Sequence, residues 1–218
     1  MTMAMNTEDL IARLAADARP VRRVPRPIVS TLVWLIAAAA VVGAVVALFG
    51  FRHDLPQRLA SGVDLPQMIF AGLAGVAAGF AGFQLALPDR DPRWGWLPVP
   101  PALAWVATMG WGCVQDTLTH GLGALVPGVS IPCLVFILAL GLPLTLGGGM
   151  LARHAAGFRP TPVAALIGLS AACFASIGLT LVHHLDAAMT MLVWHGVAVL
   201  VVTLAAARIG PRAMAAAA

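Results

Sequence analysis

Long apolar stretches alternate with short polar connections along almost the whole chain. Six of these stretches approach twenty residues without an internal charged side chain, which is the length that an α-helix needs to cross a hydrocarbon core about 30 Å thick. They cover residues 28–51, 66–87, 97–114, 131–151, 162–183 and 187–207. The pattern predicts an all-α fold, an integral membrane bundle of six transmembrane helices that occupies residues 28–207.

Composition agrees with a membrane protein. The chain is 60% hydrophobic and 10% charged, whereas soluble domains carry about 25% charged residues. All thirteen basic residues are arginines, and they lie in short runs between the apolar stretches rather than along one stripe. We therefore interpret the basicity as membrane topology and expect no direct contact with nucleic acid. Because the first residues are polar and acidic, we also expect no removable signal peptide.

The arginines divide unequally between the two sides of the predicted bundle. Only Arg52 and Arg58 fall on one side. The other side carries Arg13, Arg19, Arg22, Arg23, Arg26, Arg90, Arg93, Arg153, Arg159, Arg208 and Arg212. The positive-inside rule then predicts a multi-pass protein of the bacterial inner membrane with both termini in the cytoplasm. Residues 1–27 and 208–218 would be cytoplasmic tails.

The N-terminal tail begins with a predicted amphipathic helix over residues 8–19, which Pro20 ends. A helix of about 12 residues is marginal in water, so it needs a surface to bind. It either rests on the membrane or orders in the groove of a cytoplasmic partner. A basic, proline-rich spacer follows up to Pro27. The apolar side of the helix comprises Leu10, Ile11, Leu14 and Ala18, and the charged side comprises Glu8, Asp9, Arg13 and Asp17.

Thiols and imidazoles gather on the side opposite the termini. Cys113 closes the third span and Cys133 opens the fourth, so we expect both at similar depth. His183, His184 and Asp186 form the turn between the last two spans, and these five residues are the candidate signal-sensing site. The connection after the third span adds Asp116 and His120.

This grouping has three interpretations. In an oxidising compartment, Cys113 and Cys133 form a disulfide if their Cα atoms lie about 4.4–6.8 Å apart. Alternatively, Cys113, Cys133, His183 and His184 hold zinc or another soft metal ion. In the third interpretation the cysteines only pack as small apolar residues. No cofactor follows with certainty from the sequence.

Polar residues inside the spans are few. No Asp, Glu or Arg lies deep in any span, which weighs against ion pumping. His195 lies about two turns inside the sixth span, where a buried imidazole needs a hydrogen-bond partner. Ser170 on the fifth span and His195 imitate the serine–histidine pair of rhomboid proteases, but the second glycine and an oxyanion donor are missing. We therefore predict that the protein is not an enzyme.

Small residues mark two further spans. The second span has glycines at three- and four-residue spacing, which predicts one face for close helix packing. These glycines are Gly72, Gly75, Gly79 and Gly82. Cys173, near the middle of the fifth span, is interpreted as a packing residue.

Several segments, in the same order along the chain, resemble the NrsF (negative regulator of sigma F) family of six-span anti-sigma factors. They are residues 9–21, 110–113, 133–137 with 141–144, and 186–195. The resemblance implies a protein that holds an extracytoplasmic-function sigma factor at the inner membrane and frees it when stress is sensed outside. It also implies sensing by cysteines, which corresponds here to Cys133 together with Cys113. Some members carry a further cysteine where this chain has His183 and His184, which favours a mixed thiol and imidazole site.

Our hypothesis from the sequence is therefore a membrane-embedded anti-sigma factor whose partners are an extracytoplasmic-function sigma factor and the lipid bilayer. One rival is a small-molecule or metal-ion permease, which the missing carboxylates and internal repeats oppose. Another is a membrane scaffold without a sensing role. In the preferred hypothesis the sigma-binding residues are Glu8, Asp9, Leu10, Ile11, Arg13, Leu14 and Asp17.

Overall fold

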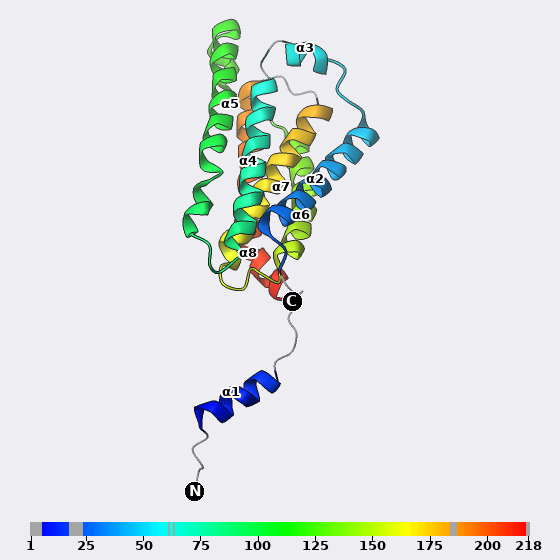
Figure 1. The fold of residues 1–218 in the computed structure, drawn as a ribbon. Coiled ribbons are helices and arrows are strands. Elements are labelled where there is room, and N and C mark those ends of the chain that lie inside the picture. The colour runs from blue at the N-terminus through cyan, green and yellow to red at the C-terminus, as the bar shows by residue number, and fades with distance from the viewer. Residues whose placement is uncertain (1–5, 18–23, 61, 63, 184–186, 217–218) are drawn as a thin grey trace.

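The computed structural model describes residues 6–17, 24–60, 62, 64–183 and 187–216, and within them it contains only helices and connections (Figure 1). Six helical segments are long and apolar enough to cross a membrane, which confirms the predicted fold class. The elements are α1 (Thr7–Ala16), α2 (Pro27–Phe49), α3 (Leu55–Ala60), α4 (Asp64–Leu85), η1 (Pro92–Trp96), α5 (Val99–His120), η2 (Leu122–Leu125), α6 (Ile131–Ala152), α7 (Pro160–Val182) and α8 (Ala188–Ala216).

Local sequence signals set several of these boundaries. Proline occupies the first turn of α2 and α7, where its missing N–H would have no helical partner. The side chain of Asp91 accepts a 2.8 Å hydrogen bond from the backbone N–H of Arg93 and caps η1. Gly50 and Gly121 follow the last residues of α2 and α5 with φ values of 78° and 79°, which favour glycine.

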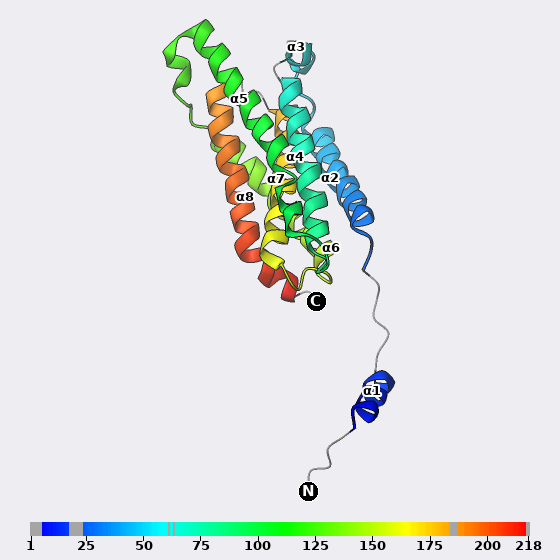
Figure 2. The ribbon, with the colours of Figure 1, turned by 60° about the vertical axis from the view of Figure 1, so that its left-hand side comes forward.

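Helix α7 forms the centre of the bundle. It packs against α8, α4, α6 and α2, and it lies between them in both views (Figures 1 and 2). Helix α2 is at the periphery, and large apolar residues such as Ile36 and Leu48 are mostly exposed on it. Apolar side chains on the outside and small ones inside are expected when lipid is the solvent.

Glycine allows α7 to approach its neighbours closely. A Cβ atom at Gly75 of α4 would lie 3.1 Å from Cβ of Cys173, and one at Gly168 of α7 would lie 2.5 Å from Cβ of Ala206 on α8. Such distances leave no room for a side chain, so the helix backbones themselves are in contact. This confirms that the glycine face of α4 serves packing.

Three predicted boundaries are wrong. Helix α5 continues two turns beyond Cys113 to His120, so Asp116 and His120 are helical rather than in a loop. Helix α8 continues beyond the predicted end of the sixth span at residue 207 and ends at Ala216. Helix α4 begins at Asp64, whose side chain is fully buried, so a carboxylate does enter the second span. In each case polar side chains are satisfied by neighbouring groups, which a count of apolar residues does not detect.

Candidate functional site

Helix α1 exposes its apolar side. Its described residues include none that is buried, and Leu10, Ile11 and Leu14 are 42%, 55% and 64% exposed. Glu8 and Asp9 lie in the first turn, where carboxylates interact favourably with the helix dipole. Asn6 precedes the helix but its side chain makes no capping hydrogen bond. The predicted end at Arg19 lies outside the described residues, and α1 ends at Ala16.

The two candidate sensor thiols lie in different parts of the bundle. Cys113 belongs to α5, which packs on α4 and α8, whereas Cys133 is in the first turn of α6, which packs on α7 and α8. Both are buried, and Cys113, Cys133 and Cys173 are all free thiols. The disulfide between Cys113 and Cys133 is therefore not formed in this structure.

The imidazoles of the candidate metal site are only partly described. His184 and Asp186 lie outside the described residues. His183 follows α7, and its Nδ1 is buried and has no hydrogen-bond partner among the residues that the structure describes. Among the described residues, no three His, Cys, Asp or Glu side chains come together as a metal-binding group. The metal site thus remains a prediction.

Hydrogen bonds tie the connection between α5 and α6 to α8. The backbone N–H of Gly128 donates to Thr190 Oγ1 at 2.9 Å, and the Trp194 indole donates to the Gly128 carbonyl at 2.8 Å. At the start of α6, the Ser130 hydroxyl donates to Cys133 Sγ at 3.1 Å instead of capping the helix. Cys133 therefore lies at a junction where α6, the preceding connection and α8 meet.

Asp116 joins α5 to α8 at the same end of the bundle. Its carboxylate accepts a 2.9 Å hydrogen bond from the backbone N–H of Ala188, the first residue of α8. A carboxylate at this position satisfies an N–H that has no partner within the helix and interacts favourably with the helix dipole. Asp116 thus has a structural role that its predicted position in a loop did not indicate.

A network of partly buried ion pairs lies between α2 and α4. Arg58 contacts Asp64 through two hydrogen bonds of 3.0 and 2.7 Å, and Arg52 contacts Asp54 through two of 2.7 and 2.6 Å. Arg52 also lies 3.9 Å from Asp64, and its backbone N–H donates to Leu181 of α7. Sequence reasoning missed this network, although the matching numbers of Arg and Asp between the first two spans were a signal for it.

The resemblance to a serine–histidine pair is not realised. Ser170 Oγ accepts a hydrogen bond from the Trp34 indole and donates to the carbonyl of Gly75. His195 is buried on α8 and lines a small cavity with Ser176, not Ser170. The Nδ1 atom of His195 has no partner among the described residues.

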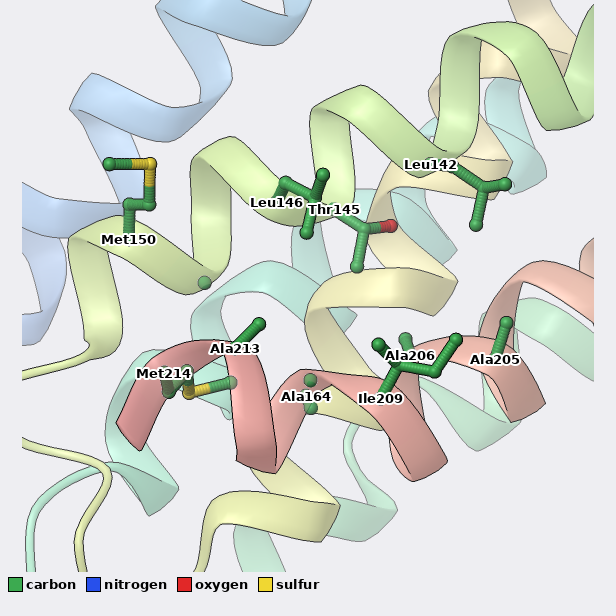
Figure 3. Close-up of a pocket in the computed structure, with 12 residues that line it drawn as sticks. Leu142, Thr145, Leu146, Met150, Ala164, Ala205, Ala206, Ile209, Ala213 and Met214 are labelled. Carbon is green, nitrogen blue, oxygen red and sulfur yellow. The ribbon is translucent and has the colours of Figure 1, made fainter. Parts of the chain in front are cut away.

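A groove larger than this cavity has an almost entirely apolar lining. It has a volume of about 410 Å³ and lies between α6 and α8, with Ala164 of α7 in its lining (Figure 3). The hydroxyl of Thr145 in this lining already donates to the carbonyl of Gly141. The groove therefore offers almost no polar contact to an ion or a polar solute.

These features define a multi-pass α-helical membrane protein with an uncovered amphipathic helix outside the bundle. Residues 14–215 match the sequence model of the NrsF family, described as negative regulator of sigma F, and the chain belongs to this family. The family assignment confirms the resemblance, and with it a role as an anti-sigma factor in transcription regulation. No curated protein and no solved structure matches the chain.

Proposed function

We propose that this protein sequesters an extracytoplasmic-function sigma factor at the bacterial inner membrane and releases it when a redox or metal stress reaches the periplasmic face. The family description supports a sigma factor as the partner. The excess of arginine at the end of the bundle that carries the termini supports a cytoplasmic location for that end. Sequestration needs a binding surface and two conformations, but no chemistry.

The uncovered apolar side of α1 is the observation on which the binding proposal rests. Leu10, Ile11 and Leu14 are all exposed, and burying one such side chain fully contributes about 1.5–3 kcal/mol. Three of them in the groove of a partner would hold a short helix that is marginal alone. The charged residues Glu8, Asp9, Arg13 and Asp17 would flank this contact and set its specificity.

The sensing half of the proposal rests on the position of Cys133. Its side chain is fully buried at the junction of α6 with α8, so an oxidant or a thiophilic metal ion reaches it only when this junction opens. A modified thiol would no longer fit there and would hold the bundle in the open state. Cys113, with His183, His184 and Asp186, would complete the sensing face.

The coupling free energy that this mechanism requires between the sensing face and the sigma-binding helix is small. A tenfold loss of sigma-factor occupancy needs about 1.4 kcal/mol of difference between the closed and open bundle. Helix α8 joins the two ends of the bundle, because it starts beside Gly128 and Asp116 at one end and reaches Ala216 at the other. A shift of α8 is therefore a direct route from the thiol to the cytoplasmic face.

Two charge substitutions on α1 test the binding proposal. Leu14→Glu places a carboxylate on the apolar side of α1, whereas Ala12→Glu places the same carboxylate on the opposite side. We expect Leu14→Glu to lower the amount of sigma factor that co-purifies with the full-length membrane protein at least tenfold, and Ala12→Glu to leave it near the wild-type level. Equal retention by both variants, and by a chain lacking residues 1–20, would remove α1 from the mechanism.

A further inference from the structure

Two buried residues that line the same cavity each have a polar atom without a hydrogen-bond partner in the part of the chain that the structure describes. These atoms are Oγ of Ser176 on α7 and Nδ1 of His195 on α8, and both residues are 2% exposed. Leaving a buried polar atom without a hydrogen bond costs free energy, and in a bilayer no water is available to form that bond. Such atoms are therefore expected to have partners. Neither function nor packing, as described above, accounts for them.

The cavity has the size of a single water molecule. About 10 Å³ is available to the centre of a water-sized sphere, which is room for one water. Residues of α4 and α5 also line it, among them Gln67 and Met109. The site therefore has polar groups in its lining, is formed by residues of four helices and is large enough for one small occupant.

We propose that this cavity binds one water molecule, which bridges Ser176 Oγ and His195 Nδ1. A water molecule both donates and accepts, so it satisfies the serine hydroxyl and either tautomer of the imidazole. It would join α7 to α8 through an exchangeable contact, whereas Gly168 and Ala206 join the same two helices by direct packing nearer the termini. The inference rests on the fold and does not depend on the proposed function.

Hydroxyl-radical footprinting of the wild-type protein in phospholipid nanodiscs tests the proposal directly. X-rays convert a bound water into a radical that oxidises adjacent methionines, here Met109. Met191 is the control, because it is equally buried, at 4% exposed, but does not line the cavity. We expect Met109 to be oxidised several-fold faster than Met191. Equal slow rates would show an empty cavity and overturn the proposal.

A double-mutant cycle tests the bridge. If one water serves both atoms, Ser176→Ala and His195→Phe each lose the same bridge, and their effects on thermal unfolding are less than additive. Thr203→Val is the matched control, because Thr203 on α8 also carries a buried hydroxyl that finds no partner within the described ranges but does not line the cavity. Its effect should add to that of His195→Phe. Additive behaviour of Ser176→Ala with His195→Phe would contradict a shared ligand.

Elemental analysis separates water from the other occupant that the lining would accept. Two thioethers, Met68 and Met109, and the imidazole of His195 are donors that a soft metal ion prefers. We expect no stoichiometric metal in the purified wild-type protein after exposure to copper under reducing conditions. One metal ion per chain, lost in His195→Phe, would replace the proposed water.

Discussion

The indole Nε1 of Trp34 donates a 2.9 Å hydrogen bond to Ser170 Oγ, although 136 positions separate the two residues. The same hydroxyl donates to the carbonyl of Gly75 at 2.7 Å. One serine of the central helix α7 therefore links α2 to α4. A Cβ atom at Gly79 would lie 3.1 Å from Ser170 Oγ and 3.1 Å from Cδ1 of Trp34, so a larger residue at that position would crowd the pair. The contact fixes the most peripheral helix to the centre of the bundle.

The first prediction concerns this link. Ser170→Ala leaves the buried Trp34 indole without its acceptor, and hydrogen bonds within membrane proteins contribute about 0.5–2 kcal/mol. We expect Ser170→Ala and Trp34→Phe to lower thermal stability by similar amounts and to be non-additive in combination. Differential scanning fluorimetry in detergent measures this. Trp111→Phe is the control, because Trp111 is 62% exposed; an equal loss there would show that the assay reports tryptophan removal alone.

The second prediction concerns the contact of α7 with α8. A Cβ at Gly168 would lie 2.5 Å from Cβ of Ala206, too close for both to be accommodated. Gly168→Ala should cost about 1–3 kcal/mol of stability through overpacking, and the second substitution Ala206→Gly should restore part of it. Gly196→Ala on α8 meets no atom within 4 Å and should leave the unfolding temperature unchanged or raise it. Failure of Ala206→Gly to restore stability would contradict this helix contact.

The third prediction concerns the buried ion pairs. Asp64→Asn removes the carboxylate that faces Arg58 and Arg52 while nearly keeping its shape. Breaking a buried pair by removing one partner costs about 3–5 kcal/mol, so we expect much less folded protein in the membrane, measured by size-exclusion chromatography. Asp89→Asn removes an exposed carboxylate 3.9 Å from Arg90, and its effect should be within about 1 kcal/mol. Similar yields of the two variants would mean that the network is not structural.

The sequence predicts the bundle well because each membrane span can be recognised from its own stretch of residues. Six apolar stretches of the right length suffice for the spans, and the spacing of Gly75, Gly79 and Gly82 indicates the face that packs. Hydropathy does not predict the end of a helix correctly where polar side chains form hydrogen bonds with the backbone of their own helix. In α5 the hydroxyls of Thr117 and Thr119 donate hydrogen bonds to the carbonyls of Cys113 and Gln115. The helix therefore extends beyond the apolar stretch of the sequence.

The candidate site is predicted less completely because it depends on tertiary contacts. The burial of His195 follows from its position in the sixth span, but the shared cavity with Ser176 depends on how α7 and α8 rotate against each other. Cys133 opens α6 as the spans predict, but Cys113 lies two turns before the end of α5 instead of closing it. The spans also do not show that α8 lies against both of these helices. Likewise, nothing local shows which arginine pairs with Asp64. Such contacts are set by helix rotation and register, which periodicity leaves open.

The last prediction separates sensing by Cys133 from a packing role. Cys133 and Cys173 are both fully buried free thiols, so replacing either with serine introduces a buried hydroxyl. They differ in position, because Cys133 opens α6 at the proposed periplasmic end whereas Cys173 lies well inside α7. We expect Cys133→Ser to abolish induction of a sigma-dependent reporter by an oxidant or a thiophilic metal ion. Cys173→Ser should preserve it, with both variants still repressing the reporter in unstressed cells. Normal induction in Cys133→Ser would exclude that thiol as the sensor. Loss of induction in both variants would attribute the effect to packing, because Cys173 lies well inside α7 and is not part of the proposed sensing face.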